Sequence, residues 1–185
     1  MTTQIQIDGE IFQNTIKILK DLISFQTESG KSNLDLINYC DLELKKSGAS
    51  SLKTFNSSKT QANLFSTIKC ENPNELGIVL SGHTDVVPAV HSEWTSDPYL
   101  VREKDDKLYG RGTCDMKGFI ACTLAVAPLF ASSKLKRPIH FSYTFDEETG
   151  CLGAPLVLAD LKKRNLNFSA CIIGEPTNMK AITAH

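Results

Sequence analysis

The stretch LGIVLSGHTDVVP, residues 76–88, contains the clearest strand signal in the chain. Its first half, LGIVLSG, is largely apolar at successive positions, which is typical of a strand buried on both faces in the interior of a sheet. Its second half turns polar at His83 and Asp85, and Pro88 follows shortly afterwards. The stretch therefore predicts a central strand whose carboxyl end carries an imidazole and a carboxylate.

Helical and strand patterns alternate on both sides of this strand. Further strands are predicted for NLFSTIK (63–69), PIHFSYTF (138–145) and ACIIG (170–174), and helices for residues 10–25, 33–47, 116–131 and 152–163, with a long irregular segment at 83–108. This alternation predicts an α/β fold, a three-layer sandwich with a mixed, largely parallel sheet. The last residues, AITAH (181–185), read as the inside of another strand, so we expect a truncated polypeptide.

Composition excludes several classes of protein. The 185 residues are 41% hydrophobic and 22% charged with a net charge of −1, which fits one soluble domain and argues against a nucleic-acid partner. The longest mostly apolar run, 118–131, is shorter than the roughly 20 residues that cross a bilayer. MTTQIQIDGE lacks the basic region of a secretory signal. The six cysteines form no C-x-x-C pair, so we expect reduced thiols in a cytoplasmic protein.

Two glycine-containing segments carry candidate ligands. His83 and Asp85 are two residues apart, so the carboxylate is able to orient the ring of a metal-binding imidazole. A capping His and a turn Asp would explain the same residues. In LYGRGTCDMKG (108–118), Asp115 occupies the third glycine of a G-x-G-x-x-G pattern, which argues against a nucleotide loop. Asp115 is either a ligand at the start of a helix or an ordinary helix cap.

Two further strands are followed by carboxylates. FDEETG (145–150) places Asp146, Glu147 and Glu148 in a row, and neighbouring side chains of an extended backbone point in opposite directions. One of the two glutamates is therefore able to bind a cation while the other stays free. Glu175 follows the strand of ACIIGEPT. Taken singly, each of these acids is also explained as an exposed loop residue.

The combination is more specific than any of its parts. In open α/β sheets, ligands bind at the carboxyl ends of strands, where these side chains are predicted to meet. One imidazole with several carboxylates suits a pair of divalent ions such as zinc, cobalt or manganese. Such ions would remove the repulsion among the acids, and a carboxylate that binds no metal would be the natural general base.

Four motifs in this order resemble the M20 family of di-zinc metallopeptidases and deacylases: SGHTDVVP, LYGRGTCDMKG, DEETG and GEPT. The resemblance runs from about residue 77 to the end of the chain and implies a partial di-zinc aminopeptidase-like catalytic domain. The segments are most similar to those of amino-acid deacetylases of the family, because the related desuccinylases usually lack GCLG after the glutamate pair.

The resemblance implies a role for each matching residue. His83 and Glu175 would bind one metal ion, Glu148 the second, and Asp115 would bridge the two. Asp85 would orient His83. Glu147 would be the general base that takes a proton from water and returns it to the departing amine. The ions expected are zinc first and cobalt second, and the 115–116 peptide bond is a candidate for the cis form.

The resemblance also implies parts that these 185 residues lack. The family inserts a lid and dimerisation domain after the GEPT region and supplies a further histidine ligand from a C-terminal segment. We therefore expect residues 1–185 to be the amino-terminal part of the catalytic domain of a homodimeric enzyme that acts on a small acylated amino acid. His185 is not assigned as the missing ligand. A catalytically inactive metal-binding module is the rival interpretation, and the presence of Glu147 argues against it.

Overall fold

The computed structural model describes residues 9–72 and 75–183. The absence of a secretory signal, predicted from the first ten residues, and the interpretation of His185 rest on residues that lie wholly or mostly outside these ranges. The helices are α1 (Gly9–Ser24), α2 (Leu34–Lys46), α3 (Lys117–Ser132) and α4 (Ala154–Lys163), with a short 3-10 helix at His91–Glu93. The strands are β1 (Ser50–Phe55), β2 (Ala62–Ile68), β3 (Gly77–His83), β4 (Arg102–Lys104), β5 (Lys107–Tyr109), β6 (Ile139–Thr144) and β7 (Phe168–Ile173).

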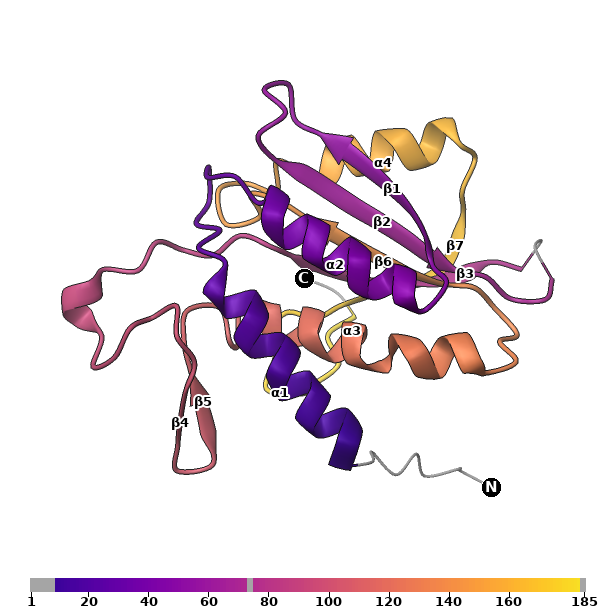
Figure 1. Ribbon diagram of the computed structural model, residues 1–185. Coiled ribbons are helices and arrows are strands. Elements are labelled where there is room, and N and C mark those ends of the chain that lie inside the picture. Colours follow the sequence, from indigo (N-terminus) through magenta and orange to yellow (C-terminus); the bar gives the residue numbers. More distant parts are fainter. Residues whose placement is uncertain (1–8, 73–74, 184–185) are drawn as a thin grey trace.

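Five of the strands form one mixed sheet in the order β1-β2-β6-β3-β7. β3 pairs in parallel with β6 and with β7, whereas β1 with β2 and β2 with β6 pair antiparallel. The predicted central strand, β3, thus lies between two parallel neighbours. The remaining two strands, β4 and β5, form a separate hairpin that projects from the body of the molecule (Figure 1).

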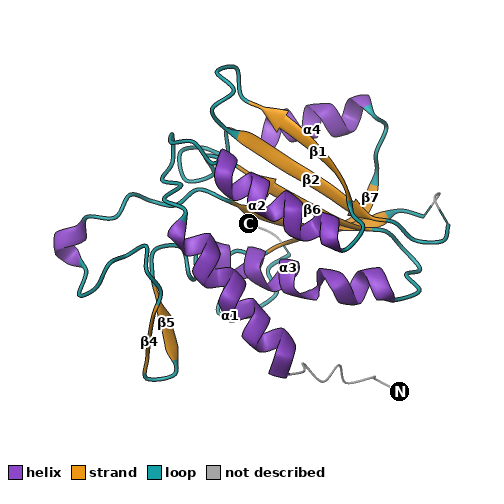
Figure 2. Ribbon diagram, in the orientation of Figure 1, coloured by secondary structure: helices purple, strands orange, loops and turns teal. Residues whose placement is uncertain are grey.

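Helices cover both faces of the sheet, which confirms the predicted three-layer arrangement. α2 and α3 pack on one face with α1 packed on α3, and α4 packs on the other face against β1 and β2 (Figure 2). Alternation along the strands supplies both cores, since Leu64 and Phe141 face the large core under α2 and α3, while Phe65 faces α4 with Val157 and Leu161. Among the described residues, no helix combines the length and apolarity needed to cross a membrane.

The sequence patterns missed three strands. β1 has the polar sequence SSLKTF, and the β4–β5 hairpin lies in the charged segment that was predicted to be irregular. The prediction of a strand at the end of the chain is wrong for residues 181–183, which have no regular structure, and residues 184–185 are not described. Within the five-stranded sheet, two strand pairings are parallel and two are antiparallel, because β1 and β2 add an antiparallel edge to the parallel strands.

The parallel strands bring distant polar residues to one edge of the sheet. His83 is the last residue of β3 and is in register with Thr144, so the loop that begins at Phe145 lies beside it. β7 ends at Ile173 on the other side of β3, two residues before Glu175. The turn before α3 depends on Gly112, whose φ of +84° favours glycine, and a Cβ there would lie 2.7 Å from Val86 Cγ1.

Candidate metal centre

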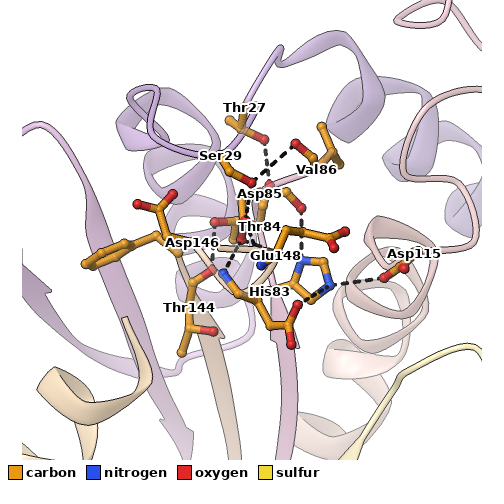
Figure 3. Close-up of polar contacts among 12 residues, drawn as sticks. Thr27, Ser29, His83, Thr84, Asp85, Val86, Asp115, Thr144, Asp146 and Glu148 are labelled. Carbon is orange, nitrogen blue, oxygen red and sulfur yellow. Dashed lines mark hydrogen bonds and ion pairs between the residues drawn. The ribbon is translucent and has the colours of Figure 1, made fainter. Parts of the chain in front are cut away.

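His83 is the centre of the polar cluster at the carboxyl ends of the strands. Its side chain is buried, and Nε2 lies 3.1 Å from Asp115 Oδ1, 3.7 Å from Glu175 Oε1 and 3.9 Å from Glu147 Oε2. Nδ1 lies 2.9 Å from the backbone oxygen of Asp85. A proton on Nδ1 would be donated to that carbonyl, which leaves the Nε2 lone pair directed at the carboxylates (Figure 3).

Three of the predicted ligands form a group of the size that holds a cation. One ligand atom from each of His83, Asp115 and Glu175 lies within 4.8 Å of the other two. His83 is buried while the two acids are partly exposed, so the group is open on one side. One imidazole nitrogen with two carboxylate oxygens is a donor set that suits zinc or a similar divalent ion. The residues present therefore fit a metal ion.

The pKa shifts of the cluster also favour a bound cation. Burial alone would lower the pKa of His83, but the carboxylate of Asp85 and the charge of Glu175 outweigh it and raise the pKa to about 9. Burial raises the pKa of Glu175, and so does the repulsion from Asp115 and the other acids, against the opposing effect of His83. The pKa of Glu148 is raised by burial and by the charge of Asp115. The acids crowd one another, and a cation would relieve that crowding.

The carboxylate of Asp85 is buried and organises the backbone around it. Oδ1 accepts a hydrogen bond from the Glu147 backbone N–H at 3.0 Å. Oδ2 accepts one from Glu148 N–H at 3.3 Å and one from the Ser29 hydroxyl at 2.7 Å. The distance from Oδ1 to His83 Nδ1 is longer, 3.6 Å. In this structure the ring of His83 is held by the backbone oxygen of Asp85, while its carboxylate holds the loop of the two glutamates.

The two glutamates of that loop differ in their surroundings. Glu147 is partly exposed, with Oε2 at 3.9 Å from His83 Nε2 and Oε1 at 3.5 Å from the thiol of Cys151. Glu148 is half-buried, and burial together with the charges of Asp115 and Glu147 raises the pKa of its carboxyl group. Its carboxylate does not belong to the three-residue group of His83, Asp115 and Glu175. The assignment of Glu148 to a second ion therefore stays a prediction.

The structure adds residues that the sequence patterns did not single out. Lys117 is fully buried on the first turn of α3, and its ammonium donates to the carbonyls of Leu22 at 3.1 Å and Phe25 at 2.7 Å. Burial lowers the pKa of Lys117 to about 7. The peptide bond between Asp115 and Met116 is cis, as the resemblance implied. Ser29 and Lys117 carry no sequence signal of their own, because their partners lie far away in the chain.

Comparisons with known proteins agree with this geometry. Residues 79–184 match the family described as Peptidase family M20/M25/M40. A protein of Salmonella typhimurium named acetylornithine deacetylase is 42% identical over 123 residues, which are 66% of this chain and 31% of that protein. One of the same name from Buchnera aphidicola subsp. Schizaphis graminum is 36% identical over 173 residues, 92% of this chain and 45% of that protein.

The fold also matches solved structures. An M20 family metallo-carboxypeptidase, Sso-CP2 from Sulfolobus solfataricus, superimposes with a TM-score of 0.72 at 22% identity over 91% of this chain and 37% of that one. The chain thus spans less than half the length of each of these relatives. M20 enzymes are metal-dependent hydrolases, which is consistent with the group around His83. With more than half of its residues matched by the family, the chain belongs to peptidase family M20/M25/M40.

Proposed function

We propose that this chain is part of an acetylornithine deacetylase, a metal-dependent amide hydrolase that converts N2-acetyl-L-ornithine and water into ornithine and acetate. The observation that carries the proposal is the position of Glu147, whose carboxylate lies 3.9 Å from the His83 nitrogen that faces Asp115 and Glu175. A carboxylate that is beside the ion site but outside the ligand group has the placement of a general base. The names of the relatives support the choice of substrate.

The residues of the cluster are assigned either to metal binding or to proton transfer. His83, Asp115 and Glu175 would hold one divalent ion, and Asp115 and Glu148 would hold a second. Zinc is the first candidate and cobalt the second. Ions bound there would supply Lewis acidity toward the amide carbonyl and toward water. Glu147 accepts the proton of the attacking water and then donates it to the departing amine, so that the amine leaves in neutral form.

Partial exposure of Glu147 suits this proton transfer. Its side chain is 37% exposed, whereas that of Asp85 is only 3% exposed. The exposed carboxylate is able to meet substrate and water, while the buried one is restricted to holding the backbone. The same contrast explains why one acid of the cluster is assigned to chemistry and the other to geometry.

Several wider properties belong to the same proposal. The reaction would serve arginine biosynthesis in the cytoplasm, and the intact protein would be a homodimer. The 185 residues would be the amino-terminal part of its catalytic domain, a view supported by the 31% and 45% of the two relatives that they match. A desuccinylase of the same family is the nearest alternative, and the GCLG segment at residues 150–153 favours the deacetylase.

Glu147→Gln tests the assignment in the intact protein. The amide keeps the size of the carboxylate but does not accept a proton, so we expect kcat on N2-acetyl-L-ornithine to fall roughly 100-fold to 10,000-fold with unchanged metal content. Exposed Glu93→Gln is the matched control and should retain both. Metal loss in proportion to activity would show that Glu147 is a ligand. Faster turnover of a succinylated diamino acid would instead favour the desuccinylase.

A further inference from the structure

The loop between α1 and α2 contacts three of the segments that form the metal centre, those that carry His83, Asp115 and Glu147. Phe25 accepts a hydrogen bond from Lys117, two residues after Asp115. Thr27 donates its hydroxyl to the carbonyl of Thr84 and accepts the backbone N–H of Val86. The Ser29 backbone N–H in turn donates to Val86 O at 3.1 Å. This loop, residues 25–30, is therefore built into the site, although no residue of it belongs to the predicted ligands or base.

Two contacts of the loop reach the segment that carries the proposed base. The Ser29 hydroxyl donates to Asp85 Oδ2 at 2.7 Å, and the same carboxylate accepts the backbone N–H groups of Glu147 and Glu148 (Figure 3). The N–H of Gly30 donates to Asp146 Oδ1, also at 2.7 Å. Ser29 and Gly30 thus bind the carboxylates of Asp85 and Asp146. Asp85 in turn holds the backbone of Glu147 and Glu148, and Asp146 directly precedes them.

Asp146 adopts a backbone conformation that needs such support. Its φ is +51°, in the left-handed region that is uncommon for residues other than glycine. The side chain is buried, and Oδ1 accepts from Gln61 Nε2 as well as from Gly30 N–H, both at 2.7 Å. These bonds hold the residue directly before Glu147, so they restrict the direction in which Glu147 leaves the end of β6.

We propose that Ser29 is a positioning residue for Glu147, acting through the carboxylate of Asp85. The proposal rests on the role of Glu147 as general base. Without the Ser29 hydroxyl, Asp85 Oδ2 keeps only the longer bond from Glu148 N–H, at 3.3 Å, so the rotation of the carboxylate is less restrained. Rotation of Asp85 lengthens the bond to Glu147 N–H and lets the base move relative to His83. Asp146, held by Gly30, is the second attachment of the same segment.

The test is Ser29→Ala in the intact, metal-loaded protein, with Ser29→Thr as the variant that keeps the hydroxyl. Ser32→Ala is the matched control, because Ser32 is exposed in the same connection and, within residues 9–72 and 75–183, its hydroxyl bonds only to Leu34 N–H. We expect kcat on N2-acetyl-L-ornithine to fall roughly tenfold to a hundredfold for Ser29→Ala, with metal content and KM near those of the wild type. Ser29→Thr should recover most of the loss.

Hydrogen–deuterium exchange gives a readout that does not depend on turnover. In Ser29→Ala, a peptide covering residues 145–149 should exchange about tenfold faster than in the wild type and in Ser32→Ala, because Asp85 no longer holds the two amides rigidly. A lowered melting temperature with unchanged kcat and unchanged exchange at 145–149 would overturn the proposal and leave Ser29 a stabilising residue only. Faster exchange in a protein that hydrolyses no acylated amino acid would refute the function while keeping the attachment.

Discussion

The two buried histidines of the sheet lie at opposite ends of it and in opposite surroundings. His83 ends β3 among carboxylates, and its pKa is raised to about 9. His140 is near the start of β6, between the rings of Phe65 and Phe168 at 5.3 and 4.9 Å, and burial lowers its pKa to about 4. The same side chain is therefore a candidate ligand at one end and an apolar packing element at the other.

The difference follows from where polar groups are able to gather. The carboxyl ends of the parallel strands lead into loops that carry Glu147 and Glu175, and the turn before α3 adds Asp115 to the acids around His83. At the other end, Nδ1 of His140 has a partner in the Thr67 hydroxyl at 2.9 Å, and Nε2 packs so closely on Gly77 that a Cβ there would lie 2.1 Å from it. A cavity of about 590 Å³ adjoins His140, and no carboxylate of the described residues forms an ion pair with this imidazole. Burial alone does not identify a site, whereas burial among carboxylates does.

Replacing each histidine by leucine is the strongest test of this contrast. His83→Leu removes the only nitrogen ligand of the three-residue group, so zinc affinity and turnover should both fall more than about a thousandfold. His140→Leu should keep the zinc affinity of the wild type within about threefold, while the changed packing alters its stability. Zinc titration by calorimetry measures both. Equal losses in the two variants would remove the distinction between the two ends.

The pH dependence of stability tests the other histidine. The folded-state pKa of His140, about 4, lies below the ordinary value of 6.5, so the unfolded chain binds this proton first as the pH falls. The neutral imidazole therefore costs nothing above pH 6.5, and stability is lost between pH 6.5 and 4. The loss approaches about 3 kcal/mol at the low end.

Urea denaturation at several values of pH between 7 and 4 measures this loss. His140→Leu should show a shallower decline than the wild type, whereas Thr67→Val, which keeps the buried imidazole, should retain most of it. Parallel declines in the wild type and His140→Leu would mean that His140 is protonated in the folded protein.

Lys117→Met measures how much the buried hydrogen bonds of the Lys117 ammonium, beside the metal centre, contribute to the stability of the fold. Methionine keeps the length of the side chain but leaves the carbonyls of Leu22 and Phe25 without their donor, so the free energy of unfolding should fall by about 2 kcal/mol. Exposed Lys20→Met, which breaks only the surface ion pair with Glu103, should change it by less than about 0.5 kcal/mol. Chemical denaturation compares the two. Similar values for both would indicate that water replaces the ammonium of Lys117.

The sequence predicts the cluster around His83 better than it predicts the polar strand at the edge of the sheet. The apolar strands and the polar residues after them predicted that His83 and Glu175 lie at one edge of the sheet, because parallel strands bring their carboxyl ends together, and the glycine-rich turn before α3 predicted Asp115 as their neighbour. β1 was missed because its side chains are mostly polar and its place depends on pairing with β2. No local pattern distinguishes a strand of that kind from a loop.

Contacts over long sequence separations account for the rest. Ser29 is 56 residues from Asp85, and the Lys117 ammonium meets a carbonyl 92 residues earlier. Periodicity within a short window contains no information about such pairs. The same limit applies to His140, which sits in a strand pattern as good as that of His83 and differs from it only in what the fold packs around it.

The smallest effect is expected at Cys151, whose thiol lies beside the proposed base. Its Sγ is 3.5 Å from Glu147 Oε1, a thiol is a weak donor, and burial raises the pKa of this one. Cys151→Ser should therefore change kcat on N2-acetyl-L-ornithine by less than about threefold. Steady-state kinetics over a range of substrate concentrations is sufficient to detect more. A tenfold loss would show that the thiol orients Glu147, and the positioning assigned to Asp85 and Ser29 would then be shared with a residue on the solvent side of the base.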